Sequence, residues 1–227
     1  LVNVARNGHI FVLEPTPEGP IHFVDAWPYV YGNVVTDIDP KTGRFTYDKA
    51  HWPVLNKKVQ FCPSLWGGKD WPSAAYSPDT DMIYIPATEN LCSTLLGIEQ
   101  EFIQGELYLG VDIPVLLEEF YMREGWDHIG EIQAWNVSDK KEVWTHNFKH
   151  HNWGPPLSTA GGLLFAGGTN DRMFRAFDSK TGEVLWDYPT NSGITAPPST
   201  FTVNGKQYVS VVSGWGVDAE RKQGVLR

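Results

Sequence analysis

One short motif recurs along the chain and constrains its fold more than any other feature. The segment AFDSKTGEVLW (176–186) matches AWNVSDKKEVW (134–144) over the same positions, with Ala first and Trp last. A third copy, DIDPKTGRFTY (37–47), keeps the turn and ends on Tyr47. Each copy predicts strand, tight turn and strand. In two copies Asp178 and Asp39 can bond their own turn backbone, and Gly182 and Gly43 supply a positive φ. The first two copies begin 42 residues apart, which is the period of a β-propeller blade.

Further hairpins fill the intervals between these copies. Strand-like segments flank Asn7–Gly8, residues 169–171 and Asn204–Gly205, and Asn-Gly is a strong hairpin signal. The exception is 93–127, which is acidic, rich in leucine and without alternation, so we predict an insertion with some helix. The remaining chain predicts an all-β fold, a β-propeller of four-stranded antiparallel blades. Residues 1–227 would form about four to five blades, the later part of a larger propeller.

Composition agrees with many short strands and argues against nucleic-acid binding and a membrane helix. The chain has ten Trp, 22 Gly and 16 Pro in 227 residues, a mixture typical of strands and turns. Its net charge of −9 would be repelled by phosphate, so nucleic acid is excluded. No segment approaches the ~20 apolar residues of a membrane helix, and the N-terminus lacks an export-signal pattern.

The two cysteines leave two readings open. Cys62 and Cys92 lie 30 residues apart and form no Cys-x-x-Cys pair, which argues against a zinc site or a thioredoxin-like centre. No Cys-x-x-Cys-His is present, so no covalently attached haem of the usual c type is expected. Two free thiols, or one disulfide in an oxidising compartment, both agree with this pattern.

The connection inside VQFCPSLWGGKDWPSAAYSPDTDMIYIPA (59–87) has an unusual composition. We read this stretch as two strands joined by a loop that holds Trp66, Gly67, Gly68 and Trp71. A connection that only turned the chain would be short and polar. We therefore expect this loop to be shaped around a ligand.

Together these segments resemble the C-terminal portion of the pyrroloquinoline-quinone (PQQ)-dependent alcohol dehydrogenases, eight-bladed quinoprotein propellers of the methanol and ethanol dehydrogenase type. The resemblance runs from ARNGHIFVLE through TAGGLLFAGGTNDRMFRAFDSKTGEVLWDY to GKQYVSVVSGWG. The repeat resembles that family's tryptophan-docking motif, whose closing Trp wedges between adjacent blades. Residues 93–127 depart from the family pattern.

The resemblance implies cofactor contacts at several positions. Arg6 matches the basic residue that contacts the quinone oxygens, where a fixed cation stabilises the charge added on reduction. Trp153 matches a cofactor-contacting residue near the start of a blade. Gly214, Trp215 and Gly216 match a segment whose backbone lies against the cofactor rim. The competing readings are a surface arginine, a blade-docking tryptophan and an ordinary strand end.

The remaining implied contacts are Asp70 and the cysteine pair. Asp70 occupies the position where the family has an Asn that bonds the cofactor, and this departure puts the contact in question. A carboxylate beside a tricarboxylated quinone needs Lys69, Arg6 or a metal to offset it, or must be protonated. Cys62 and Cys92 match a disulfide of some methanol dehydrogenases, which implies a periplasmic location.

The family chemistry also requires groups that this chain does not match. In the family, calcium or a lanthanide polarises the quinone, an aspartate takes the alcohol proton, and hydride passes to the quinone. The metal ligands and the base aspartate have no counterpart here and are expected upstream of Leu1. We therefore nominate no catalytic base and no metal ligand, and expect the chain alone to be inactive.

The implied partners are an alcohol, cytochrome c or another electron acceptor, the remainder of the propeller and, as an open option, a second copy in a homodimer. Two other functions stay open. One is a PQQ-dependent sugar or polyol dehydrogenase, with the same cofactor and a different pocket. The other is a non-catalytic propeller scaffold of the outer-membrane assembly type.

Overall fold

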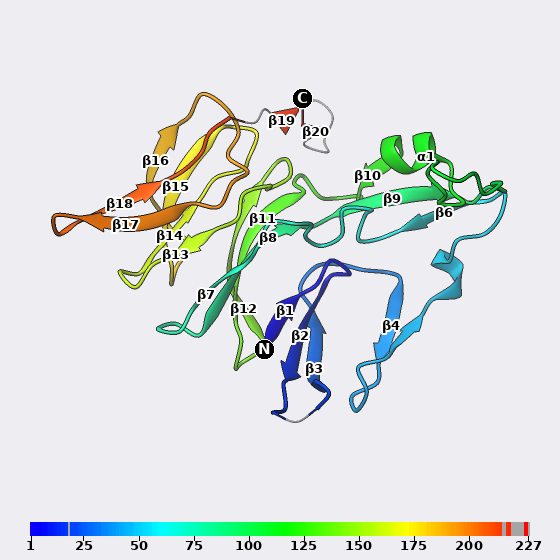
Figure 1. The fold of residues 1–227 in the computed structure, drawn as a ribbon, viewed down its shortest axis with the longest axis horizontal. Coiled ribbons are helices and arrows are strands. Elements are labelled where there is room, and N and C mark those ends of the chain that lie inside the picture. The colour runs from blue at the N-terminus through cyan, green and yellow to red at the C-terminus, as the bar shows by residue number, and fades with distance from the viewer. Residues whose placement is uncertain (18, 215–216, 219–224, 227) are drawn as a thin grey trace. The chain divides into compact units, whose positions relative to one another are not determined.

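The computed structural model describes residues 1–17, 19–214, 217–218 and 225–226 (Figure 1). These residues form two compact units, Leu1–Gly68 with Glu89–Trp126, and Lys69–Thr88 with the chain from Asp127 onward. The named strands pair in antiparallel sheets, and none of the described helices is long and apolar enough to cross a membrane.

The first unit contains three small sheets and two short helices. One sheet has the order β1-β2-β3, the second β10-β9-β6, and the third pairs β4 with β5. The strands are β1 (Val2–Val4), β2 (His9–Glu14), β3 (His22–Pro28), β4 (Val35–Ile38), β5 (Phe45–Tyr47), β6 (Lys58–Phe61), β9 (Leu91–Leu96) and β10 (Phe120–Met122). The helices are a 3₁₀ turn (Lys49–His51) and α1 (Ile113–Glu118).

The second unit contains two four-stranded sheets of orders β12-β11-β8-β7 and β13-β14-β15-β16, and two paired hairpins. The strands of the first sheet are β7 (Ala75–Ser77), β8 (Met82–Thr88), β11 (Gly130–Asn136) and β12 (Lys141–Phe148). Those of the second are β13 (Leu157–Ser158), β14 (Leu163–Ala166), β15 (Met173–Asp178) and β16 (Val184–Pro189). The hairpin strands are β17 (Ser199–Val203), β18 (Lys206–Ser210), β19 (Val217–Asp218) and β20 (Val225–Leu226).

The repeated Ala and Trp of the motif are cross-strand neighbours. Ala134 pairs with Trp144 between β11 and β12, and Ala176 pairs with Trp186 between β15 and β16. Both hairpins carry a register shift directly after the alanine. A small residue opposite the indole leaves room for the ring to lie across the hairpin, which explains why the two ends of the motif recur together.

Trp144 joins the two four-stranded sheets of the second unit. Its indole is buried, and Nε1 donates a hydrogen bond to the Ser179 carbonyl oxygen at 3.0 Å. The ring lies against Gly182 at φ +73°, where an added Cβ would come within 2.5 Å of the indole. The surrounding core takes residues from both sheets: Met82, Tyr84, Ile132, Ala134, Phe148, Leu164, Ala166 and Phe177.

The equivalent turn in the first unit has the same construction. Asp39 Oδ1 accepts the backbone N–H groups of residues 41 and 42, as Asp178 Oδ1 does for residues 180 and 181. A Cβ on Gly43 would lie 2.5 Å from the Phe23 ring, just as Gly182 faces Trp144. In both units, therefore, an aromatic ring packs against the glycine of a turn.

The other closing aromatics of the motif do not behave as Trp144 does. Trp186 is 48% exposed and Tyr47 is 46% exposed, so neither is wedged between sheets of this chain. Beside Trp186, the β17–β18 hairpin supplies only two paired strands and leaves the ring open to solvent.

The predicted hairpins at Asn7–Gly8, 169–171 and Asn204–Gly205 are confirmed, as are the strand–turn–strand readings of the motif. The stretch 59–87 contains one strand more than predicted, β7, between the loop and β8. The predicted helix within 93–127 is α1. The division of 1–227 into one partial propeller with an insertion there stays a prediction.

Replacing Gly182 with alanine tests the ring-on-turn contact. Gly205→Ala is the control, because Gly205 has φ +76° and nothing within 4 Å of the added Cβ. The control should lose about 1 kcal/mol from positive-φ strain. Gly182→Ala should lose about 1–3 kcal/mol more, because the added Cβ displaces Trp144. Urea unfolding of the full-length protein measures both, and equal losses would contradict the contact.

Candidate cofactor site

Arg6 is fixed by the loop that follows β6. Its Nη2 donates to the Leu65 carbonyl oxygen at 2.5 Å, and its own carbonyl oxygen accepts the Gly68 N–H at 2.9 Å. Arg6 is an exposed residue in the turn between β1 and β2. These two contacts tie both the guanidinium and the backbone of Arg6 to the loop.

The glycine pair of this loop is required by close backbone approach. Gly67 has φ +75°, and a Cβ there would lie 2.2 Å from the Arg6 carbonyl oxygen. A Cβ on Gly68 would lie 2.5 Å from Val30 and 2.8 Å from the Tyr29 hydroxyl. Glycine is the residue that permits such an approach. Within the first unit, the loop is therefore shaped around Arg6.

The loop is anchored to β9 at several points. Ser64 N–H donates to the Leu91 carbonyl oxygen, and Leu65 N–H donates to Ser93 Oγ, at 2.9 and 2.8 Å. A disulfide joins Cys62 and Cys92, with Cα atoms 4.5 Å apart, so the predicted bridge is confirmed. These contacts hold the strand end from which the loop reaches Arg6.

A pocket in the first unit opens beside Arg6. Its wall is largely apolar, and Arg6 contributes a charged side chain to it. The lining residues are Arg6, Asn7, Val34, Val35, Phe45, Tyr47, Pro63, Ser64, Leu65 and Gly67. A fixed cation at the edge of an apolar pocket suits a flat, anionic ligand.

Asp70 lies in the second unit next to the amino group of Lys69. Lys69 Nζ donates to the Asp70 carbonyl oxygen at 3.0 Å. Burial lowers the pKa of Lys69, and the negative charge of Asp70 opposes that shift. The lysine predicted to offset the carboxylate is therefore adjacent to it.

Trp153 is buried in the second unit in a segment with close backbone contacts. Its N–H donates to the Gly168 carbonyl oxygen at 2.9 Å. A Cβ on Gly154 would lie 2.2 Å from the Gly167 carbonyl oxygen. Asn152 Nδ2 donates to the Glu131 carbonyl oxygen at 3.3 Å, and Asn152 Oδ1 accepts the Gly154 N–H at 3.1 Å. Asn152 thus fixes the backbone on both sides of the indole.

A buried polar network lies behind Asn152. His128 Nε2 and Glu131 Oε1 are 2.8 Å apart, and Gln133 Nε2 donates to Glu131 Oε2 at 2.7 Å. Burial raises the pKa of Glu131. Burial opposes charge on His128, but hydrogen bonds to Asp127 and Glu131 raise its pKa overall. His128, Glu131 and Gln133 thus satisfy polar atoms of one another inside the second unit.

His151 packs beside Trp153, with ring centroids 5.1 Å apart. It is 1% exposed, and its Nδ1 lies 3.3 Å from Thr88 Oγ1. Burial, and then the neighbouring His150, lower its pKa to about 3. The ring is therefore neutral at ordinary pH and supports the indole as an uncharged group.

The last predicted segment is described only in part. Gly214 is exposed, and its N–H donates to the Gly193 carbonyl oxygen at 3.3 Å. Trp215 and Gly216 lie outside the described residues. Gly214 shares the second unit with Asp70 and Trp153, whereas Arg6 belongs to the first.

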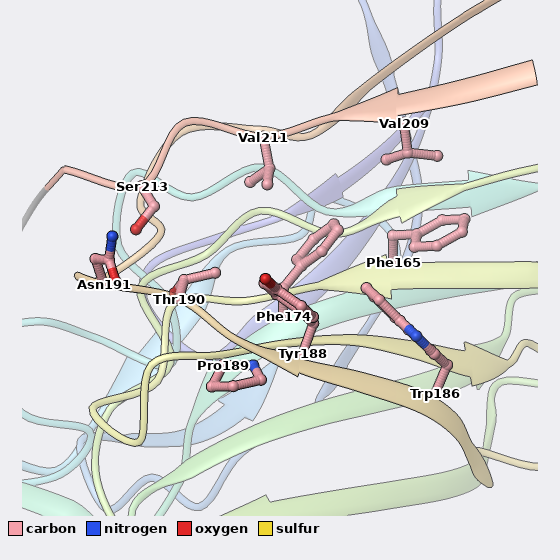
Figure 2. Close-up of a pocket in the computed structure, with 10 residues that line it drawn as sticks. All are labelled: Phe165, Phe174, Trp186, Tyr188, Pro189, Thr190, Asn191, Val209, Val211 and Ser213. Carbon is pink, nitrogen blue, oxygen red and sulfur yellow. The ribbon is translucent and has the colours of Figure 1, made fainter.

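A second, aromatic pocket lies in the second unit, and no predicted cofactor residue lines it (Figure 2). Val209 and Val211 project from the end of β18 toward the rings on the other wall (Figure 2). Trp186 and Tyr188 stack at 6.0 Å within it. The full lining is Phe165, Phe174, Trp186, Tyr188, Pro189, Thr190, Asn191, Val209, Val211 and Ser213. With a wall of this composition it resembles an open packing face more than a polar catalytic cleft.

No group of three or more His, Cys, Asp or Glu side chains with metal-binding geometry occurs among the described residues. The expectation that the metal ligands lie outside this chain stays a prediction.

Comparisons with known proteins find quinoprotein relatives of the chain. A sequence model described as the beta-propeller domain of glucose, ethanol and alcohol dehydrogenases matches residues 123–209. A quinoprotein ethanol dehydrogenase from Pseudomonas putida is 36% identical over 220 residues, which cover 93% of this chain and 33% of that protein. The chain is similar to quinoprotein alcohol dehydrogenases over nearly its whole length.

Two further relatives agree with this quinoprotein assignment. A lanthanide-dependent methanol dehydrogenase from Methylacidiphilum fumariolicum is 35% identical over 221 residues, covering 95% of this chain and 34% of that protein. The solved structure of a europium-containing methanol dehydrogenase superposes with a TM-score of 0.80 at 30% identity, covering 95% of this chain and 36% of that one. The fold prediction is confirmed, since the quinoprotein chain is a partial β-propeller that spans about a third of the length of its curated relatives.

Sequence reasoning missed the groups that position the site residues of this quinoprotein. The partner of Arg6 is the backbone carbonyl of Leu65, which has no sequence signal. Asn152 was detectable, because a polar residue between His151 and Trp153 must find a partner when its neighbours are buried.

Replacing His151 with glutamine tests its buried, neutral state. The unfolded chain takes up this proton below its ordinary pKa of 6.5, whereas the folded protein does so only near pH 3. The free energy of unfolding therefore falls as pH falls through this window. Between pH 7 and pH 5 the unsubstituted protein should lose about 2 kcal/mol more than His151→Gln.

Urea titrations at the two pH values supply the measurement. His22→Gln serves as the control because His22 is exposed. Equal pH dependence of His151→Gln and the unsubstituted protein would show that His151 is not buried in the neutral form.

Proposed function

We propose that this chain supplies one part of the cofactor pocket of a PQQ-dependent alcohol dehydrogenase. The reaction is oxidation of an alcohol to an aldehyde or ketone by hydride transfer to the quinone. The observation that carries the proposal is the Arg6 guanidinium, held by the Leu65 carbonyl at the rim of an apolar pocket. The similarity of the chain to quinoprotein alcohol dehydrogenases supports it.

The residues around Arg6 fit a planar quinone that carries carboxylates. Arg6 would bind quinone oxygens, because a fixed guanidinium donates hydrogen bonds and stabilises negative charge on them. The Gly67–Gly68 pair keeps the cation in place by packing directly on its backbone. A loop with side chains at these positions would push Arg6 away from the rim.

The second unit offers groups of matching chemistry. Trp153 would present an indole to the cofactor, with its backbone held by Gly168 and by Asn152. Asp70 would stand beside the quinone in place of the family's Asn, with Lys69 offsetting its charge. Gly214, Trp215 and Gly216 complete the proposed contacts.

When bound, PQQ supplies the two-electron acceptor, and calcium or a lanthanide supplies a Lewis acid. This chain contributes binding and orientation: Arg6 fixes one edge of the ligand, and Trp153 excludes water from a face. We assign no base aspartate and no metal ligand within the chain.

The exposed aromatic face around Trp186 fits the remainder of the propeller as a partner. Trp144 ends the preceding copy of the motif, and the turn at Asp178–Gly182 covers its ring. Trp186 has the same place in its hairpin and lies open to solvent. We propose that a further blade covers it in the full-length protein.

The Cys62–Cys92 disulfide supports a periplasmic location, because disulfides persist in oxidising compartments. The electron acceptor would be a separate cytochrome c or a comparable carrier, and a homodimer remains compatible with the proposal. A panel of primary alcohols, polyols and sugars with a dye acceptor distinguishes the alcohol reaction from the sugar alternative. Reconstitution with PQQ that produces no quinone absorbance would favour a scaffold.

Substituting Arg6 tests the proposed function. Arg6→Gln in the full-length protein should lower kcat/KM with a dye acceptor about 10²-fold, because the charge that stabilises the reduced quinone is removed. Arg6→Lys should retain part of the activity, since it keeps the charge and loses the Leu65 anchor. Arg44→Gln, at an exposed turn, is the control.

PQQ affinity and activity are measured after reconstitution with the quinone and metal. Arg6→Gln that matches the unsubstituted protein in both readouts would overturn the assignment of Arg6.

Truncating Trp186 tests the proposed blade contact. In the full-length protein Trp186→Ala should reduce the free energy of unfolding by about 3–5 kcal/mol, as Trp144→Ala should, because both rings are then buried. A loss below about 0.5 kcal/mol, typical of a surface residue, would show that nothing covers Trp186.

A further inference from the structure

The loop that joins β9 to α1 is ordered but carries an exposed apolar surface. It runs from Gly97 to Asp112 within the first unit. Gly97 bridges to Val111, and Ile98 N–H donates to the Gly110 carbonyl oxygen at 3.0 Å. The base of the loop is therefore closed like a hairpin.

Gln100 fixes the shape of the loop from inside. Its Nε2 donates to the Leu107 carbonyl oxygen at 2.6 Å. Its Oε1 accepts the N–H groups of Leu109 and Gly110, at 3.0 and 2.9 Å. Three backbone groups are thus satisfied by one polar side chain, so the conformation does not depend on burying the apolar side chains.

Those apolar side chains point away from the core. The five residues at the end of the loop, here called the apolar tip, are Phe102 (69% exposed), Ile103 (49%), Leu107 (64%), Tyr108 (55%) and Leu109 (52%). The Phe102 and Tyr108 rings pack edge to face at 5.7 Å. An exposed apolar cluster of this kind, held on a fixed loop, marks an interaction surface.

Acidic residues are interspersed in sequence with the residues of the apolar tip. Glu99, Glu101 and Glu106 are exposed, and residues 97–112 contain no Lys, Arg or His. The fourth acid, Asp112, caps α1 by accepting the Val115 N–H at 2.9 Å. A partner must therefore combine an apolar patch with positive charge around it.

We propose that loop 97–112 is the docking surface for a basic electron-carrier protein, an inference that rests on the proposed function. The apolar tip would supply the dry centre of the contact, and the three glutamates its charged rim. Each of two one-electron carriers would accept one of the two electrons that alcohol oxidation delivers to the bound cofactor, and the two protons would pass to solvent. The alcohol is oxidised and the carriers are reduced.

Charge argues against two other occupants. In a two-fold contact between copies of this chain, each glutamate of the loop would face the same acidic loop. An anionic membrane surface would repel the loop for the same reason. A protein surface with an apolar patch and positive charge is complementary to both the apolar tip and the three glutamates.

Two variants of the full-length protein, loaded with PQQ and metal, test the surface. Phe102→Ser with Tyr108→Ser removes the apolar rings, and Glu99→Gln with Glu101→Gln and Glu106→Gln removes the charge. The matched control removes three exposed charges elsewhere, with Glu14→Gln, Asp79→Asn and Glu183→Gln. The probe is a basic c-type cytochrome with lysines around its haem edge. Both cytochrome binding and turnover are measured, beside turnover with a small dye.

Each loop variant should raise the Kd and the KM for the cytochrome about tenfold, with dye-linked turnover unchanged. The effect of the glutamate variant should vanish at high salt, whereas that of the ring variant should persist. The control variant should bind the cytochrome within about twofold of the unsubstituted protein.

The inference is overturned by any of four results. These are cytochrome binding that neither variant alters, a dimer that the ring variant dissociates in sedimentation, binding to phosphatidylglycerol vesicles through the loop, and protection of Phe102 and Tyr108 from hydroxyl radicals in the free protein. Absence of dye-linked turnover in the unsubstituted protein contradicts the proposed function instead, and cytochrome binding still decides the role of the loop.

Discussion

The seating of an aromatic ring on a glycine turn is the contact on which the sheets of this chain depend. Trp144 lies on the Gly182 turn and Phe23 on the Gly43 turn, in two units built from the same motif. The aspartate at the start of each turn holds it closed by accepting two backbone N–H groups, and glycine removes the Cβ that would collide with the ring. In the second unit the ring also donates to the Ser179 carbonyl, so burial of the indole leaves its N–H satisfied. One short motif thus encodes both the hairpin and the surface on which a neighbouring aromatic packs.

Glycines that permit close backbone approach also position the candidate cofactor residues. Gly67 admits the backbone of Arg6, and Gly154 admits the backbone at Gly167, in each case at distances that exclude a Cβ. The functional side chain is then aimed by a backbone contact: the Leu65 carbonyl for Arg6 and the Gly168 carbonyl for Trp153. Such placement loses little side-chain entropy on binding, because the groups are already fixed.

Much of the fold could be predicted from the sequence, because the Asn-Gly turns and the Asp-x-Lys-Thr-Gly turns at 39–43 and 178–182 are specified by local residues. The Cys62–Cys92 bridge could not be derived from spacing and followed only from the family resemblance. Trp144 and Trp186 occupy the same place in the motif, and the sequence cannot say which is covered, since that depends on residues distant along the chain. The clamp by Gln100 was equally hidden, because its three partners are backbone groups. The composition of 93–127 indicated a departure from the repeat and not the shape of the loop.

The central proposal is that Arg6 and Trp153 each contact the quinone in the full-length protein. The most direct measurement is a crystal structure of the full-length protein with PQQ and its metal ion. The account predicts the Arg6 guanidinium within hydrogen-bonding distance of quinone oxygens and the Trp153 indole in contact with the same cofactor. Density for PQQ that touches neither residue would contradict it.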